Sequence, residues 1–102
     1  MIRHIVMWRL HEFAVGHDKA ENALRVKRAL ENLHGNIEGL LRIEVGINQL
    51  AGAQAYDLAL NADFQDWAAL ERYRDHPLHQ NVIELLNKVR TERAVVDWEV
   101  NA

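Results

Sequence analysis

The segment YRDHPLHQNV, from Tyr73 to Val82, brings together a phenol, two imidazoles and the single proline of the chain. Proline suits the first turn of a helix, because its missing N–H is not needed there and its φ angle is already helical. The segment therefore predicts that one helix ends near Tyr73 and that a second helix starts at Pro77. Tyr73 and His79, a candidate acid–base pair, are then placed on either side of a helix junction.

The sequence on both sides of this segment predicts three helices. The helix that starts at Pro77 shows an apolar stripe of helical period, at Leu78, Val82, Leu85, Leu86 and Val89. A short helix before it runs through Trp67, Leu70 and Tyr73, with Asp63 as the expected N-cap and Asp66 three residues further on. A third, near the N-terminus, is predicted from the cap Asp18 to about Leu33, and Gly35 ends it.

Four segments alternate apolar and polar residues with the period of a β-strand: Ile2 to Leu10, Leu40 to Ile47, Ala55 to Ala62 and Arg93 to Val100. In each, the more apolar face is expected to meet the helices. In the last segment that face carries Ala94, Val96, Trp98 and Val100; in the second it carries Leu41, Ile43, Val45 and Ile47.

The order strand, helix, strand, strand, helix, helix, strand predicts a single domain over residues 1–102. Two β-α-β units around a central hairpin are typical of a ferredoxin-like α+β sandwich, a four-stranded antiparallel sheet with helices on one face. The other face of the sheet mixes apolar and charged side chains. Such a face is compatible with solvent and with pairing to a second copy of the chain.

Composition excludes several kinds of function. The net charge of −3 disfavours nucleic acid as a partner. The chain has no cysteine, which excludes disulfides and thiolate metal sites and fits a cytoplasmic location. The apolar N-terminal segment is too short and too polar to span a membrane. The five glycines of the chain are scattered singly and form no phosphate-binding loop, so no cofactor is expected.

Three residues are candidates for acid–base chemistry. His4 shares a strand face with Val6, Trp8 and Leu10, so it should be partly desolvated between sheet and helices. Its side chain can then point into the same pocket as those of Tyr73 and His79. The wall of this pocket is expected to be formed by Leu58, Trp98 and Trp8. Removing a proton next to a carbonyl group and delivering one to its oxygen requires side chains of these types. The alternative is structural: a buried histidine or a tyrosine at a helix end is commonly satisfied by packing and backbone hydrogen bonds. His76 and His79 are three residues apart without a third ligand close in sequence, so no metal is expected.

Three stretches, IRHIVMWRL, LERYRDHPLHQNV and VVDWEV, resemble the stress-responsive A/B barrel (Dabb) family. The resemblance implies a ferredoxin-like fold and a homodimer whose two sheets face each other in a dimeric α+β barrel. Cyclases of that family use a tyrosine and a histidine at the positions of Tyr73 and His79, and a strand histidine that matches His4. A second strand histidine falls at Leu58, where this sequence departs from the cyclases.

Three functions remain open at this point. The first is a small cofactor-independent enzyme, cyclase- or lyase-like, acting on an apolar carbonyl compound. The second is a non-catalytic dimeric protein of the stress or ligand-binding type. The third, drawn from the fold alone, is a monooxygenase that handles haem or a quinone.

Overall fold

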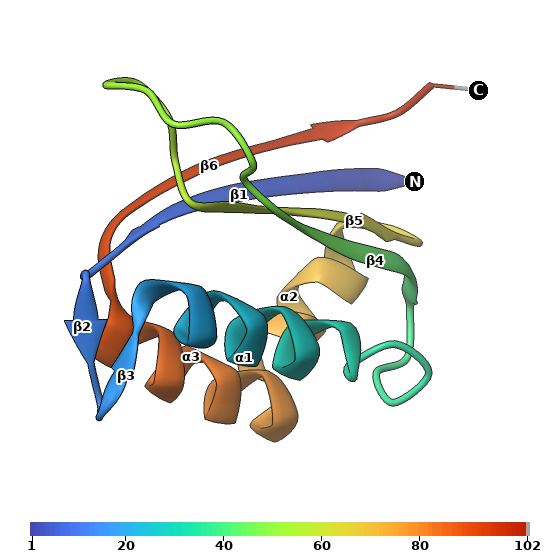
Figure 1. Cartoon of the computed structure of the whole chain (residues 1–102). Coiled ribbons are helices and arrows are strands. Elements are labelled where there is room, and N and C mark those ends of the chain that lie inside the picture. Colours follow the sequence, from blue (N-terminus) through green and yellow to red (C-terminus); the bar gives the residue numbers. More distant parts are fainter. Residues whose placement is uncertain (102) are drawn as a thin grey trace.

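The computed structural model describes residues 1–101. Four strands, β1 (Ile2–Leu10), β4 (Leu40–Ile47), β5 (Leu58–Phe64) and β6 (Arg90–Glu99), form an antiparallel sheet in the order β4-β5-β1-β6. Three helices, α1 (Lys19–Glu31), α2 (Trp67–Asp75) and α3 (Pro77–Val89), lie against one face of the sheet (Figure 1). The predicted ferredoxin-like α+β fold is confirmed. None of the helices in residues 1–101 is long and apolar enough to cross a membrane.

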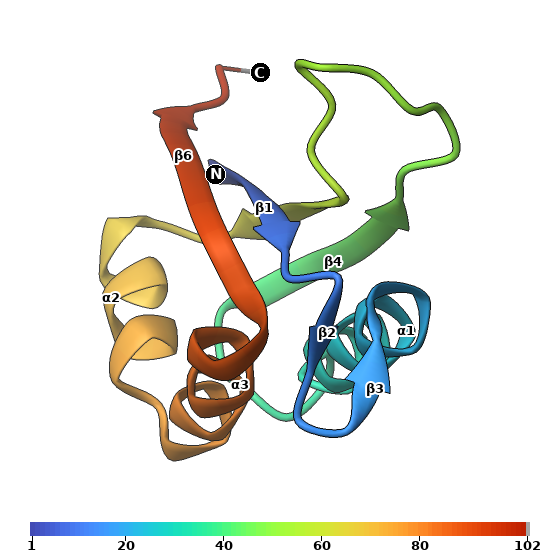
Figure 2. The same ribbon diagram turned by 60° about the vertical axis from the view of Figure 1, so that its left-hand side comes forward.

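The connection between β1 and α1 contains a small hairpin that the sequence did not predict. β2 (Phe13–Ala14) pairs with β3 (His17–Asp18), and the turn between them places Val15 and Gly16 at positive φ angles of 47° and 82° (Figure 2). The side-chain amide of Asn22, which is fully buried on α1, donates to the carbonyl oxygen of Ala14 at 3.0 Å. Strands of two residues are too short to show a periodic pattern, so this hairpin left no signal.

One of the two predicted helix N-caps is confirmed and the other is wrong. Asp18 caps α1 and accepts a hydrogen bond from the Glu21 N–H at 2.9 Å, as predicted. His76 caps α3, where its ring accepts from the Leu78 N–H. The cap of α2, however, is Asp66, which accepts from Ala69, so the expectation that Asp63 caps this helix is wrong.

Asp63 belongs instead to β5, which runs two residues further than predicted. Its carboxylate is buried on the helix-free face of the sheet between two arginines, 2.9 Å from Arg3 and 3.2 Å from Arg42. The hydrogen bond from Arg3 holds the pKa of Asp63 below its ordinary value, against the opposing effect of burial. Because both arginines hold this carboxylate in the sheet, it is not available to cap α2.

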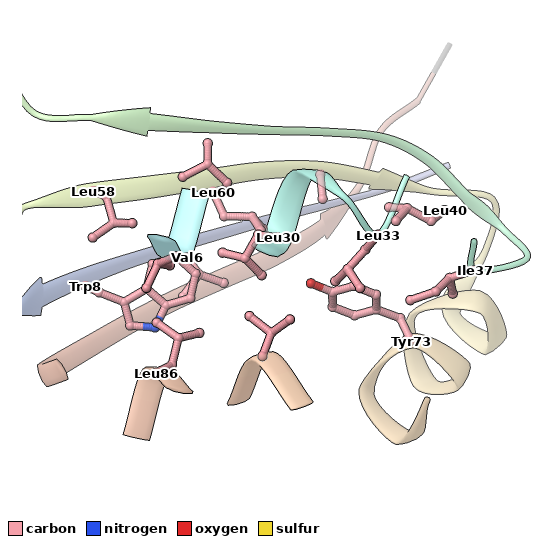
Figure 3. Close-up of a cluster of buried hydrophobic side chains, with 14 of the residues drawn as sticks. Val6, Trp8, Leu30, Leu33, Ile37, Leu40, Leu58, Leu60, Tyr73 and Leu86 are labelled. Atoms are coloured by element: carbon pink, nitrogen blue, oxygen red, sulfur yellow. The ribbon is translucent and has the colours of Figure 1, made fainter. Parts of the chain in front are cut away.

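The core fills the space between the sheet and the helices. Figure 3 shows its side chains from both layers, with Val6, Trp8 and Leu60 on strands and Leu30 and Leu86 on helices. Leu41 is an exception among the predicted core positions, because half of its surface is exposed. A break in register between Leu40 and Arg42 turns Leu40 into the core in its place.

The two faces of β6 are the reverse of those predicted. Residues directly opposite each other on paired strands share a face, and β1 pairs His4 with Asp97 and Arg3 with Trp98. Asp97 therefore lies on the helix side and Trp98 on the open face, where 41% of its surface is exposed. Both faces of β6 carry apolar residues, so alternation alone did not identify the inner one.

Candidate functional site

A cavity of about 30 Å³ lies between the sheet and the helices, and three predicted residues line it together. His4 comes from β1, Tyr73 from the last turn of α2 and His79 from the first turn of α3. Trp8 also lines it, as predicted for the pocket wall, and Arg74 and Arg93 complete its polar lining. Such a volume has room for a water molecule or two and is far too small for a drug-sized ligand.

His4 is buried, and its Nδ1 atom makes a close contact with the carboxylate of Asp97 on the neighbouring strand. Burial lowers the pKa of His4 more strongly than Asp97 raises it, so the ring is neutral at pH 7. A carboxylate only accepts hydrogen bonds, so the single ring proton must be on Nδ1. The Nε2 atom of His4 is then left with a lone pair, as a general base requires.

Tyr73 is fully buried and lies between two other rings. Its centroid is 4.8 Å from that of Phe64 and 4.0 Å from that of His79. Figure 3 shows the ring reaching from α2 into the core with its hydroxyl directed inward. Burial raises the pKa of Tyr73, because a phenolate would be poorly solvated there. The hydroxyl therefore stays protonated and can act as a hydrogen-bond or proton donor.

His79 is half-buried, and its Nδ1 atom lies 3.4 Å from the carbonyl oxygen of Arg74. Because a carbonyl oxygen only accepts, this contact favours the proton on Nδ1 and leaves the lone pair on Nε2. Burial lowers the pKa of His79, partly offset by that hydrogen bond. The cavity thus combines two neutral imidazoles that accept protons with one phenol that donates.

The sequence missed the charged groups around this cavity. Asp97 holds His4 and also pairs with Arg74 at 3.5 Å, while Arg93 contributes a second guanidinium to the lining. Asp97 comes opposite His4 only in the observed register of β1 and β6. The register itself depends on tertiary packing and cannot be read from one strand alone.

Two residues of the predicted pocket wall lie elsewhere. Trp98 is on the open face of the sheet, so its assignment to the pocket is corrected. Leu58 is buried beside Trp8 on the next strand, but it is outside the cavity lining, to which β5 contributes Leu60. Within residues 1–101, no three side chains of His, Cys, Asp or Glu gather in a geometry that would hold a metal ion.

The fold and this cavity define a ferredoxin-like α+β protein with a histidine–tyrosine cluster between sheet and helices. The model of the Stress responsive A/B Barrel Domain matches residues 2–100, and the chain belongs to this family. An uncharacterized protein of Streptomyces coelicolor is 36% identical over 97% of this chain and 99% of its own. A protein of Bacteroides fragilis, described as dimeric, ferredoxin-like and of unknown function, is 29% identical with a TM-score of 0.79, over 97% of this chain and 95% of its own.

Two enzymes share the fold at much lower identity. The hydroxynitrile lyase of Passiflora edulis superposes with a TM-score of 0.80 at 14% identity, over 98% of this chain and 93% of its own. An antibiotic biosynthesis monooxygenase superposes with a TM-score of 0.74 at 13% identity, over the full length of both chains. At such identities the similarity is one of fold only.

Proposed function

We propose that this chain is a small cofactor-independent enzyme that moves protons next to the carbonyl group of a small molecule, in a cyclase- or lyase-like reaction. The observation that supports this most directly is the convergence of His4, Tyr73 and His79 on one cavity. Their protonation states are complementary, since enolisation of a carbonyl compound requires one base and one proton donor, and either imidazole can serve as the base.

The elementary step uses only groups of this chain. The Nε2 atom of His4 or His79 takes a proton from the carbon next to the carbonyl, and the electron pair of that C–H bond forms the carbon–carbon double bond of an enol. The Tyr73 hydroxyl gives its proton to the carbonyl oxygen, and the protonated imidazole then returns a proton to the phenolate. Asp97, in contact with Nδ1 of His4, stabilises the imidazolium form and acts as a positioning residue.

Deuterium incorporation tests this step without knowledge of the natural substrate. Small ketones and aldehydes in D₂O exchange the hydrogens next to the carbonyl when an enol forms, and NMR follows the loss of signal. We expect Tyr73→Phe to slow the protein-catalysed exchange by about a hundredfold or more, the usual contribution of a proton donor. Tyr56→Phe is the matched control, since Tyr56 lies outside the cavity lining. Equal exchange rates in the two variants would overturn the proposal.

A non-catalytic role is the second candidate, and the size of the cavity favours it. About 30 Å³ is far below the few hundred Å³ of most small-molecule sites, so a larger ligand enters only if α2 or α3 moves. In this reading the histidine–tyrosine cluster stabilises a stress protein. The wild-type protein would then show no deuterium exchange activity, and Tyr73→Phe would change only its thermal stability. The third reading, a monooxygenase, has fold similarity as its only support.

Two copies of the chain are proposed to pair through the open face of the sheet. This face exposes Met7, Val96 and Trp98 beside the cluster of Asp63 with its two arginines. The Bacteroides fragilis protein, described as dimeric, is of the same fold and nearly the same length. The cytoplasm stays the proposed location, and the absence of cysteine supports it.

A further inference from the structure

Two guanidinium groups line the cavity of His4, Tyr73 and His79, and they differ in their partners. Arg74 lies 3.5 Å from the carboxylate of Asp97. Arg93 lines the cavity from β6 and makes no salt bridge among residues 1–101, and the charge of Asp97 acts on it only at longer range. Glu92, its neighbour in sequence, pairs with Arg9 at 2.8 Å and is therefore engaged elsewhere. With both imidazoles neutral, the cavity has one positive charge in excess.

The charge of Arg93 reaches all three candidate catalytic residues. It contributes to the lowered pKa of His4 and of His79, and it opposes the rise in the pKa of Tyr73. Arg93 both lines the cavity and is exposed to solvent, so it connects the cavity to the protein surface, and its position is called the mouth of the cavity here. A group bound by Arg93 therefore lies at the mouth, next to the proton-transfer residues and outside the small interior volume.

We infer that Arg93 binds the carboxylate of the substrate, and that the substrate class is a short acid with a carbonyl group next to its carboxylate, a 2-oxo acid. A guanidinium holds a carboxylate through two parallel hydrogen bonds, which orients as well as attracts it. The carboxylate occupies the mouth, and only the carbonyl and the carbon beside it enter the interior. The small volume of the cavity and the unpaired charge at its mouth then have one common explanation.

This inference rests on the proposed function, which makes the cavity a substrate site, and measurements of binding test it directly. The probes are pyruvate and pyruvamide, which share shape and carbonyl group but differ in charge. Dissociation constants come from NMR titration of the labelled protein. We expect the wild-type protein to bind pyruvate at least about tenfold more tightly than pyruvamide. Arg93→Gln should abolish this preference, whereas Arg90→Gln, which removes a neighbouring charge outside the lining, should keep it.

Equal affinity of the wild-type protein for the two probes, or no saturable binding of pyruvate, would overturn the inference. So would a preference that survives Arg93→Gln. The Tyr73→Phe variant separates this result from the proposed function, because it should keep the preference for pyruvate while losing deuterium exchange. If Arg93→Gln exchanges both probes at the wild-type rate, the catalytic proposal stands and the assignment of Arg93 fails.

Discussion

At the scale of single residues, the cavity depends on keeping two histidines neutral inside the protein. His4 and His79 both have a pKa below the ordinary value of 6.5, chiefly because burial disfavours the charged ring. A neutral imidazole with a lone pair on Nε2 is already in the form that a general base needs. The same burial has a consequence for stability, since the unfolded chain takes up protons that the folded chain resists.

The stability of the protein should therefore fall as the pH drops below about 6.5. In that range each histidine of the unfolded chain binds a proton while the folded one stays neutral, so protonation favours unfolding until the pH passes below the folded pKa. Urea unfolding between pH 7.5 and 5 measures this slope. We expect it to be shallower in His4→Gln than in the wild type and unchanged in His34→Gln, an exposed control. A slope unaffected by His4→Gln would show that His4 is not buried in the neutral form.

Residue types and their spacing were enough to bring His4, Tyr73 and His79 together from the sequence, because each belongs to an element with a clear period. The same reasoning could not find Asp97 or Arg93. Both lie on β6, whose faces are similarly apolar, and only the pairing of His4 with Asp97 identifies the inner one. The charged residues that reach a site from two neighbouring strands depend on the register between those strands, and the register is a property of the strand pair and not of either strand alone.

At the scale of elements, α2 is the helix on which the site depends, because its last turn carries Tyr73. Its position is set by Asp66 at its start and by its contact with the turn before β4. Sequence reasoning placed this helix correctly and chose the wrong cap. Asp63 and Asp66 are both residues of a type that caps helices. Asp66 takes this position because arginines of β1 and β4 hold Asp63 in the sheet.

Gly39 is expected to be the glycine at which substitution most disturbs α2. It has a φ angle of +86°, and an added Cβ would lie 2.5 Å from the Cβ of Ala69. Gly35 has a similar φ of +82° and open space around it, so Gly35→Ala measures backbone strain alone, about 1 kcal/mol. Gly39→Ala should cost about 1–3 kcal/mol more, from overpacking against the helix. Urea unfolding of the two variants compares them, and equal losses would mean that α2 shifts freely.

At the scale of the whole molecule, the order of elements was sufficient to predict the fold. Once the connections are short and the strands antiparallel, few arrangements cover an apolar sheet face with three helices. The sequence did not determine whether the other face of the sheet meets solvent or a second copy of the chain, because that face carries both apolar and charged residues. The exposure of Val96 and Trp98 on that face gives a physical reason for a second copy to cover it.

Neighbouring residues of β6 provide a direct test of that pairing. Val95 and Val96 are exposed to similar extents, 47% and 53%, but they lie on opposite faces of the sheet. A glutamate at position 96 would leave an unpaired charge in the proposed interface, and it should raise the dissociation constant of the dimer by about a hundredfold or more. Val95→Glu adds the same charge on the helix side and should leave the dimer intact. Sedimentation at micromolar concentration distinguishes the two, and a wild-type monomer, or equal effects of both substitutions, would contradict pairing through this face.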